Sequence, residues 1–222
     1  MVAVLVLDFD GTVLDTEWPA YQSWAEIWEA HGHELTVASW ARRIGKQHEL
    51  DALAELSERV GQPLDEALRR ERERRKKALT EAAPLNAGVL AWLDEAERLG
   101  VPVGIASSSP PDWVEHHLER LGLRARFGCL ACCDGALPSK PDPTSYRHAV
   151  AQLGGDPAES VAVEDSEHGV NAAVEAGLFT VAVPHDLTAH MDLSNADLVL
   201  DALDQLTLAD ALERSRRRPR RR

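Results

Sequence analysis

Two aspartates, Asp8 and Asp10, stand directly after the apolar run Val2–Leu7 and are followed by Gly11. A short apolar run is typical of a buried strand, and carboxylates at the carboxyl end of such a strand face the crevice where open α/β sheets bind ligands. Because they are spaced two apart, we expect Asp8 and Asp10 to point to the same side of an extended backbone. We therefore expect this pair to hold a hard cation and to supply a nucleophile.

Three further polar clusters follow other apolar, strand-like segments of the chain. They are Ser107 after Val101–Ala106, Lys140 in the loop after Phe127–Cys133, and Glu164 with Asp165 after Val161–Val163. Because the carboxyl ends of parallel strands meet at one edge of a sheet, we expect these side chains and the two aspartates to share one crevice. Two acidic clusters, a hydroxyl and an ammonium suit phosphoryl transfer through a metal.

Each of these side chains has a role in such a reaction. Asp8 would attack phosphorus and form an aspartyl-phosphate, while Asp10 would protonate the leaving oxygen and later deprotonate water. Mg²⁺ held by Asp8, Asp165 and a backbone carbonyl would offset the repulsion between carboxylate and phosphate. Ser107 would donate a hydrogen bond to a phosphoryl oxygen, and Lys140 would neutralise developing charge.

The order of the segments that position these residues predicts the fold class. Short apolar runs alternate with helix-like segments of about 10–15 residues, which indicates βαβ units. The segment after Ser107 shows the helical spacing at Val114, His117, Leu118 and Leu121. Glycines stand where three of the expected helices should end, at Gly100, Gly122 and Gly177. The sequence therefore predicts an α/β fold with a Rossmann-like, mostly parallel sheet core.

One connection is much longer than an ordinary βα loop. More than 70 residues separate Asp10 from the helix expected near Gly88. Their apolar residues recur at helical spacing, which predicts an inserted α-helical cap domain at residues 15–84 and leaves residues 1–14 and 85–213 for the core. Four of the six tryptophans lie in the insertion. We interpret them as the small core of the cap, with a ligand-binding box as the alternative.

The insertion also carries a charged run, Arg69–Lys77. We expect most of this run to be a solvated helix face with pairing between residues four apart. One or two of its basic side chains are candidates to reach a negatively charged substrate.

Composition and charge argue against several other functions. The net charge is −13, and seven of the 24 basic residues stand in the last nine positions, so the rest of the chain is strongly acidic. An acidic surface disfavours general nucleic-acid binding. We predict a disordered, Arg-rich tail at residues 214–222, with contact to RNA or an acidic surface as the alternative. No apolar stretch approaches the ~18 residues of a membrane span, and no signal peptide is evident, so we expect a cytoplasmic protein.

The three cysteines, Cys129, Cys132 and Cys133, lie close together. They lack the second pair that a structural zinc site of this spacing needs, and an odd number argues against a disulfide framework. We interpret them as small buried residues of a strand.

Taken together and in this order, the polar clusters resemble the four motifs of the haloacid-dehalogenase-like (HAD) hydrolases. The motifs correspond to Asp8–Glu17, Ser107, Lys140–Pro143 and Glu164–Ser166, and the resemblance covers the chain except the arginine tail. The helical insertion is similar to the cap of the β-phosphoglucomutase-like phosphatase branch. An aspartate at position 10 is what separates phosphatases and mutases of this family from its dehalogenases.

The resemblance implies a Mg²⁺ cofactor and a set of site residues. The implied nucleophile is Asp8, the acid/base is Asp10, and both act with Ser107 and Lys140. The metal site would be formed by Asp8, Asp10, Glu164 and Asp165. The substrate phosphate would be bound by Thr12, Ser107, Ser108 and Lys140, with Gly45 and His48 contributed by the cap. An exposed loop histidine is the alternative for His48.

Two departures from the mutases of this branch favour hydrolysis. The mutases carry a histidine shortly after the first motif that holds the acid/base aspartate out of place until sugar binds, and that position is Ala20 here. They also carry an arginine in the cap loop after a glycine, whereas Gly45 is followed by Lys46, Gln47 and His48. Asp10 would then be free to activate water.

We therefore expect an enzyme, a phosphoric monoester hydrolase acting on a small phosphorylated metabolite such as a sugar phosphate. A phosphosugar mutase is the first alternative, and a HAD-like domain retained only for binding is the second. The complete set of catalytic positions argues against the second. We expect no membrane partner, no specific nucleic acid, and a monomer.

Overall fold

The computed structural model describes residues 2–41 and 52–218 of the chain. Two compact units form within it. The first, called here the α/β unit, comprises Met1–Leu14, Leu85–His185 and Met191–Arg222. The second, called the helical unit, comprises Asp15–Pro84 and Asp186–His190. Its first segment spans the same residues as the predicted cap, and its second segment was not foreseen.

The α/β unit is built on a six-stranded sheet with the order β3-β2-β1-β4-β5-β6, and every neighbouring pair of strands is parallel. The strands are β1 (Leu5–Leu7), β2 (Val103–Ser107), β3 (Cys129–Cys132), β4 (Val161–Glu164), β5 (Phe179–Ala182) and β6 (Leu198–Val199). In the sheet, Leu5 of β1 pairs with Val103 on one side and Val161 on the other. The predicted fold class is confirmed.

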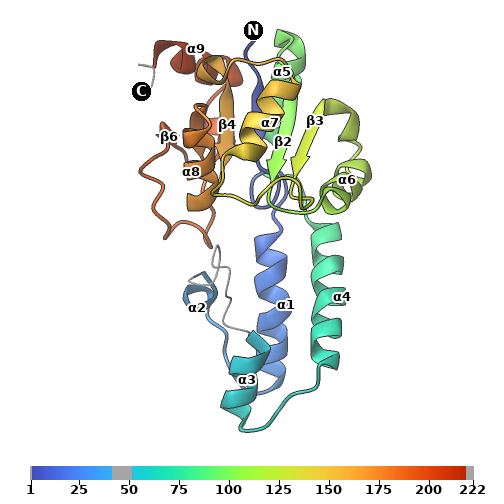
Figure 1. Ribbon diagram of the computed structural model, residues 1–222. Helices are drawn as coiled ribbons and strands as arrows, with labels where there is room; N and C mark the ends of the chain where they lie inside the picture. The colour runs from blue at the N-terminus through green and yellow to red at the C-terminus, as the bar shows by residue number, and fades with distance from the viewer. Residues whose placement is uncertain (1, 42–51, 219–222) are drawn as a thin grey trace. The chain divides into compact units, whose positions relative to one another are not determined.

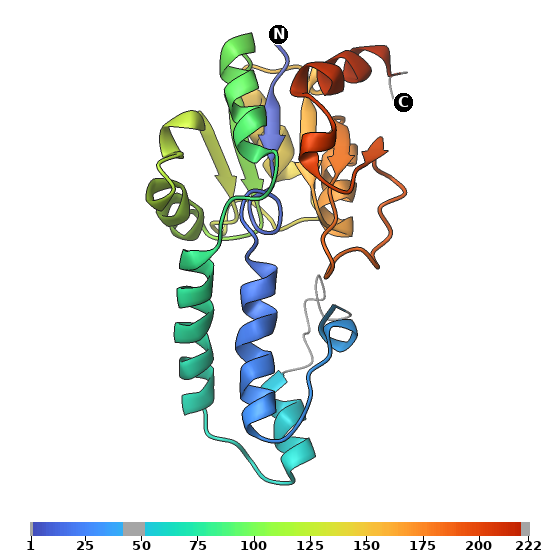
Figure 2. The ribbon, with the colours of Figure 1, turned by 180° about the vertical axis from the view of Figure 1, so that it is seen from behind.

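Helices cover both faces of this sheet. They are α5 (Val89–Leu99), α6 (Pro111–Arg120), α7 (Thr144–Gln152), α8 (Glu167–Glu175) and α9 (Leu208–Arg217). Helices α7 and α8 lie on one face, and α5 and α9 lie on the other (Figures 1 and 2). Because both faces are covered, the central strands β1, β2 and β4 do not alternate polar and apolar residues, and Ser107 and Glu164, which end β2 and β4, are their only polar side chains. All three residues of β1 are fully buried.

The described part of the helical unit contains four helices. They are α1 (Glu17–Ala30), α2 (Val37–Ala41), α3 (Ala52–Val60) and α4 (Ala67–Ala82). Helices α1 and α4 run side by side (Figures 1 and 2). Trp24, Trp28 and Trp40 are buried in one hydrophobic cluster of this unit, which confirms their interpretation as core residues. Trp18 is 40% exposed.

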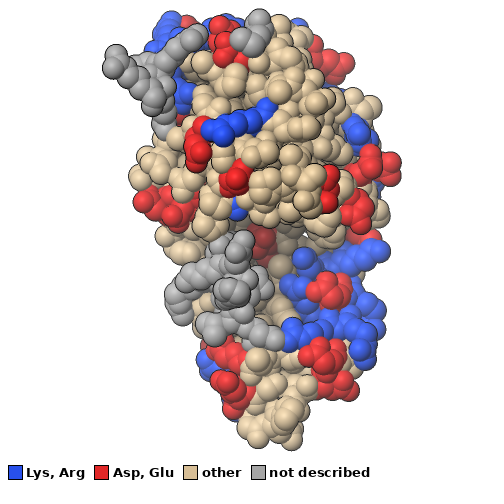
Figure 3. Space-filling view, in the orientation of Figure 1, with Lys and Arg blue, Asp and Glu red and all other residues tan. Residues whose placement is uncertain are grey.

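The charged run lies on α4, where basic side chains gather on the surface (Figure 3). Its pairs include Arg69 with Glu66 and Arg74 with Glu71, three residues apart, and Lys77 with Glu81, four residues apart. Arg75 instead reaches α1, where its Nε and Nη2 donate to the two carboxylate oxygens of Glu26 at 2.7 and 2.8 Å. A solvated face with ion pairs is thus present as expected, although two of these three pairs are three residues apart and not four. The Arg75 contact also connects α4 to α1.

The predicted disordered tail is wrong for residues 214–218, and residues 219–222 lie outside the described residues. Helix α9 runs to Arg217. The next residue, Arg218, donates hydrogen bonds to the carbonyls of Gly177 and Leu178 at 2.7 and 2.8 Å. Within the described residues, no helix is both long and apolar enough to cross a membrane.

Candidate active site

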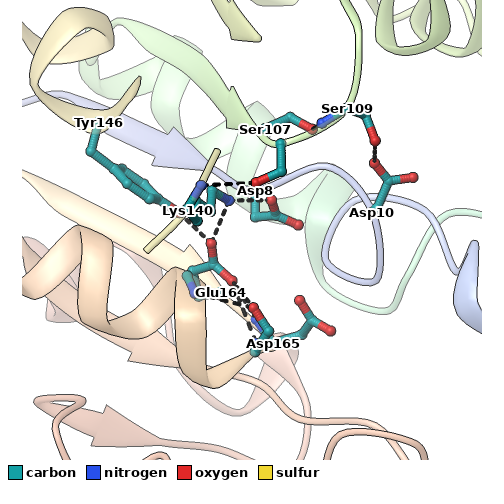
Figure 4. A network of polar contacts seen from close by, with 11 residues as sticks. Asp8, Asp10, Ser107, Ser109, Lys140, Tyr146, Glu164 and Asp165 are labelled. Carbon is teal, nitrogen blue, oxygen red and sulfur yellow. Dashed lines mark hydrogen bonds and ion pairs between the residues drawn. The ribbon is translucent and has the colours of Figure 1, made fainter. Parts of the chain in front are cut away.

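The carboxyl ends of the three central strands bring Asp8, Ser107 and Glu164 together. Strand β1 lies between β2 and β4, and Asp8 follows its last residue, while Ser107 and Glu164 are the last residues of β2 and β4. All three side chains are buried. Figure 4 shows them close together. The convergence expected from the strand pattern is therefore present, and the sheet order explains it.

Lys140 joins two of these acidic residues. Its Nζ donates to Asp8 Oδ1 and to Glu164 Oε1, the second at 2.5 Å, and its side chain is 5% exposed. Burial alone would lower the pKa of Lys140, but the carboxylates of Asp8 and Glu164 outweigh burial and hold the pKa above its ordinary value. Lys140 is therefore a permanent positive charge beside Asp8.

Glu164 is the most tightly held carboxylate of the site. Besides Lys140, its Oε1 accepts a hydrogen bond from the Tyr146 hydroxyl at 2.7 Å. Its Oε2 accepts from the Asp165 backbone N–H and the Ser166 hydroxyl, both at 3.2 Å. Gly169 provides the space, because a Cβ there would lie 1.9 Å from Glu164 Cδ. Both oxygens of Glu164 are thus occupied by donors of the protein.

Tyr146 was missed by the sequence analysis. It lies in α7, is fully buried, and its ring lies 5.1 Å from the Lys140 Nζ. Burial and the nearby Glu164 carboxylate raise the pKa of Tyr146 well above its usual range, so its hydroxyl stays a donor. The signal available in the sequence was its place in the first turns of the helix that follows Lys140.

Asp165 is positioned by a residue that was also missed, His185. The ring Nε2 of His185 lies 3.1 Å from Asp165 Oδ2. His185 follows β5, so the strand-end rule that identified the other clusters would have found it here. The turn after Asp8 approaches Asp165 closely. Gly11 has φ +88° and a Cβ on it would meet Asp165 Oδ2 at 2.5 Å, so this approach requires glycine.

Asp8, Glu164 and Asp165 form a buried carboxylate group, with one oxygen from each lying within 4.8 Å of the others. Burial raises the pKa of Asp8 well above its ordinary value; Lys140 acts against this, and the carboxylates of Glu164 and Asp165 add to it. Burial also raises the pKa of Asp165, against the influence of His185. The concentration of negative charge suits a further cation.

Asp10 does not share this group, in contrast to the expectation that it would point to the same side as Asp8. The expectation assumed an extended backbone, but β1 ends at Leu7 and the chain turns through Gly11. In the turn, the Val13 N–H donates to the Phe9 carbonyl at 2.9 Å. The Asp10 carboxylate instead accepts hydrogen bonds from the Ser109 hydroxyl and the Trp113 indole, so it is not free in the sense expected.

The remaining predicted residues have different settings. The Thr12 hydroxyl is buried and makes no hydrogen bond within the described residues. Ser108 is exposed, and its hydroxyl accepts from the Lys140 backbone N–H at 3.1 Å. Gly45 and His48 lie outside the described residues.

The three cysteines are free thiols. Burial raises the pKa of Cys132 to about 12 and also raises that of Cys129, so neither thiol ionises near neutral pH. The described part of the chain offers one group of three or more His, Cys, Asp or Glu ligands, and it contains no cysteine. The interpretation of the three cysteines as buried strand residues holds for Cys132 alone, because Cys129 is half-buried in β3 and Cys133, also half-buried, follows the strand.

Comparison with known proteins agrees with this arrangement. The family of haloacid dehalogenase-like hydrolases matches residues 2–177 of the chain. YhcW of Bacillus subtilis (strain 168) is 36% identical over 217 residues, which cover 96% of this chain and 97% of YhcW. Hexitol phosphatase B of Escherichia coli (strain K12) is 31% identical over 226 residues, covering 95% of this chain and 97% of the phosphatase.

Comparison with solved structures also finds haloacid dehalogenase-like hydrolases. A crystal structure of a HAD family hydrolase from Deinococcus radiodurans R1, with bound phosphate and sodium, has a TM-score of 0.79 at 27% identity. The match covers 95% of this chain and 96% of that one. The resemblance inferred from the four motifs is confirmed, and one of these relatives is named a hexitol phosphatase. The chain belongs to the haloacid dehalogenase-like hydrolases and is a phosphoric monoester hydrolase.

Proposed function

We propose that this hydrolase is a Mg²⁺-dependent phosphatase that cleaves a small phosphomonoester, a phosphorylated sugar or sugar alcohol, through an aspartyl-phosphate on Asp8. The observation that carries the proposal is the setting of Asp8, a buried carboxylate that contacts Lys140 and belongs to the group with Glu164 and Asp165. The similarity to hexitol phosphatase B supports the class of substrate.

The donor set fits a divalent, oxygen-preferring cation. The group has three buried carboxylates, and the ammonium of Lys140 pairs with two of them, Asp8 and Glu164. Buried charge is stabilised only when it is paired. Because both Glu164 oxygens already accept from the protein, we assign ion binding to Asp8 and Asp165 and assign Glu164 to holding Lys140. When bound, the ion would supply positive charge beside the phosphoryl oxygens.

The chain's own residues carry the two chemical steps. An Asp8 oxygen forms a bond to phosphorus while the ester bond to the leaving oxygen breaks, and Asp10 gives its proton to that oxygen. Water then attacks the aspartyl-phosphate and gives a proton to Asp10, and the bond between phosphorus and Asp8 breaks. This releases inorganic phosphate and restores both aspartates. Lys140 stabilises the ionised form of Asp8 in each cycle.

The phosphate would also contact residues beside Asp8. The buried hydroxyl of Thr12 lacks an acceptor within the described residues, and a phosphoryl oxygen would provide one. Ser107, at the end of the neighbouring strand, is the second hydroxyl in reach of the same crevice. We further propose that the helical unit acts as the cap that selects the group esterified to phosphate.

The test of the mechanism is hydrolysis of p-nitrophenyl phosphate with and without Mg²⁺. Asp8→Asn should abolish turnover, because the amide is not a nucleophile, and chelation should abolish turnover of the unaltered protein. Asp94→Asn, a change at an exposed aspartate, is the matched control and should retain full activity. Activity of Asp8→Asn, or activity that survives chelation, would refute the proposed mechanism.

A second experiment tests the assignment of the ion without using turnover. Titration calorimetry with Mg²⁺ should show binding to the unaltered protein and much weaker binding to Asp165→Asn. Equal affinity of the two proteins would show that Asp165 is not a ligand.

Substrate class and the mutase alternative are decided by the products. A set of phosphorylated sugars and sugar alcohols should include a substrate turned over faster than p-nitrophenyl phosphate. From β-glucose 1-phosphate we expect free glucose. Accumulation of glucose 6-phosphate would favour the mutase, although Ala20 occupies the place of its gating histidine and is buried in the core of the helical unit.

A further inference from the structure

Asp10 is held at both carboxylate oxygens by residues about a hundred positions further along the chain. Its Oδ2 accepts a hydrogen bond from the Ser109 hydroxyl at 2.6 Å, which Figure 4 shows. Its Oδ1 accepts from the indole Nε1 of Trp113 at 2.9 Å. Both are good distances for hydrogen bonds to a carboxylate. The orientation of the Asp10 side chain is therefore set by two donors of the α/β unit.

The two donors are themselves fixed in place. The Ser109 backbone N–H donates to the Ser107 hydroxyl at 3.0 Å, and the Ser109 carbonyl accepts from the Cys133 N–H at 3.1 Å. Trp113 lies in the first turn of α6, and its ring meets that of His117 edge-on, with 4.3 Å between ring centroids.

His117, which contacts the Trp113 ring, also packs against the turn that carries Asp10. The His117 side chain is 1% exposed, and its ring stacks on the Phe9 ring with 6.2 Å between centroids. Phe9 stands between Asp8 and Asp10 in the chain. The indole donor and the carboxylate that it binds are thus positioned by the same packed aromatic cluster.

We propose that Ser109 and Trp113 are positioning residues that hold Asp10 in its acid/base orientation without help from the helical unit. The inference rests on the proposed role of Asp10. A carboxylate has about four acceptor sites, so two fixed donors leave Asp10 able to exchange a proton with substrate or water. Both donors belong to the α/β unit, so their hold on Asp10 does not require a bound substrate.

Holding Asp10 without a bound substrate matters most in the second step, the hydrolysis of the aspartyl-phosphate. Once the dephosphorylated product has left, no substrate remains to orient the acid/base. Asp10 must still accept the proton of the attacking water as the bond between oxygen and phosphorus forms and the bond from phosphorus to Asp8 breaks. A carboxylate fixed by the protein itself favours this hydrolysis over return of the phosphoryl group to a sugar.

The test uses pre-steady-state kinetics with p-nitrophenyl phosphate at saturating Mg²⁺. p-Nitrophenolate leaves without a proton, so formation of the aspartyl-phosphate is spared when Asp10 is misplaced, while its hydrolysis is not. For Trp113→Phe, which removes only the N–H donor, we expect a burst of about one nitrophenolate per enzyme. The steady-state kcat should then be about tenfold below that of the unaltered protein, within the ~10²–10⁴-fold that general acid–base catalysis contributes.

Further variants make the test specific. Ser109→Ala should behave like Trp113→Phe, and Ser109→Thr, which keeps the hydroxyl, should restore kcat. Trp92→Phe is the matched control. Trp92 lies in α5, and its indole donates to the Leu206 carbonyl at 2.7 Å rather than to Asp10, so the kinetics of this variant should be unchanged. In an Asp10→Ala background, Trp113→Phe should change kcat less than twofold, because a positioning residue has no effect once its target is gone.

The outcomes separate the inference from the proposed function. Two results for Trp113→Phe would overturn the inference. One is a burst amplitude that falls in proportion to kcat, as it would for partly unfolded protein, and the other is an unchanged or higher kcat. The same holds for a full further loss of kcat in the Asp10→Ala background. Wild-type activity of Asp10→Ala itself would instead refute the role of Asp10, whatever the behaviour of Trp113→Phe.

Discussion

At the scale of single residues, the site depends on a chain of contacts from Tyr146 through Glu164 and Lys140 to Asp8. The nucleophile is thus controlled by a lysine that is itself held by a carboxylate with no exposed surface. A hydrogen bond to a buried charged group is worth more than one between neutral groups. Removing the Tyr146 hydroxyl, at the far end of this series of contacts, should therefore lower both the stability and the rate.

Tyr146→Phe removes the hydroxyl that donates to Glu164 Oε1 and keeps the ring beside Lys140. We expect the free energy of unfolding to fall by about 1.5–3 kcal/mol, the range for a hydrogen bond to a charged group. Urea denaturation measures this, and kcat should fall because Lys140 is less firmly held. Tyr21→Phe is the control: its hydroxyl donates to the neutral carbonyl of Leu35 at 2.9 Å, so the loss should be smaller and kcat unchanged. Equal losses for the two variants would contradict this account.

Gly169→Ala tests how tightly the carboxylate of Glu164 is enclosed. Alanine normally favours a helix interior by up to about 1 kcal/mol over glycine, but here the new Cβ would lie 1.9 Å from Glu164 Cδ. We expect the variant to be destabilised by several kcal/mol, roughly 3 or more, and to lose activity.

A second substitution identifies the cause of that loss. Adding Glu164→Asp, which withdraws the carboxylate by one methylene, should recover stability in thermal unfolding but not activity, because Lys140 loses its anchor. If the double variant is no more stable than Gly169→Ala, the clash is not with Glu164.

At the same scale, the sequence is a good guide to which residues come together and a poorer guide to the direction of their side chains. The strand-end rule placed Asp8, Ser107, Glu164 and Asp165 correctly because it depends only on strand order. It failed for the direction of Asp10, because a turn after Leu7 rotates that side chain away from the group. The donors to Asp10 lie 99 and 103 positions away, and no local spacing rule relates them to it.

At the scale of elements, the helical unit is completed by a short segment from the other end of the chain. Asp186–His190 belongs to this unit, and Leu187 is fully buried in the cluster that contains Trp24 and Trp28. The apolar spacing in residues 15–84 predicted the helices of the unit but could not indicate that a residue about a hundred positions further on fills its core. That information exists only in the packed structure.

Leu187→Ala should therefore destabilise the helical unit. Truncation of a buried leucine costs about 2–5 kcal/mol, depending on how far the surroundings collapse. Tryptophan fluorescence measures this directly, because three buried tryptophans share the cluster with Leu187. Leu99→Ala is the control. Leu99 lies in α5 and is 40% exposed, so the same change there should alter the free energy of unfolding by less than about 0.5 kcal/mol. A midpoint equal to that of the control would show that Leu187 contributes nothing to the unit.

At the scale of the whole molecule, the chain has a net charge of −13, yet a long-range ion pair of Arg218 with Asp197 fastens the end of α9 to the segment that precedes β6. Arg218 Nη1 lies 2.5 Å from Asp197 Oδ2, with side-chain exposures of 12% and 9%. The density of arginines after position 213 predicted a disordered tail, because a run of like charges repels itself in solution. The acceptors that order Arg218 come from two distant segments, and a local composition rule does not see them.

Arg218→Ala removes a guanidinium that pairs with Asp197 and donates to the carbonyls of Gly177 and Leu178. Removing one member of a buried pair leaves the other charge uncompensated and costs about 3–5 kcal/mol, which for a chain of this size lowers the Tm by at least roughly 6 °C. Arg217→Ala is the matched control, because Arg217 is 77% exposed and pairs with Glu213 on the helix surface, so its Tm should change by less than about 2 °C. Raising the salt to about 0.5 M should preserve most of the difference, since buried pairs are screened little. Equal Tm values for the two variants would mean that the last residues of α9 are held by the helix alone, and that Arg218 does not fasten them to the sheet.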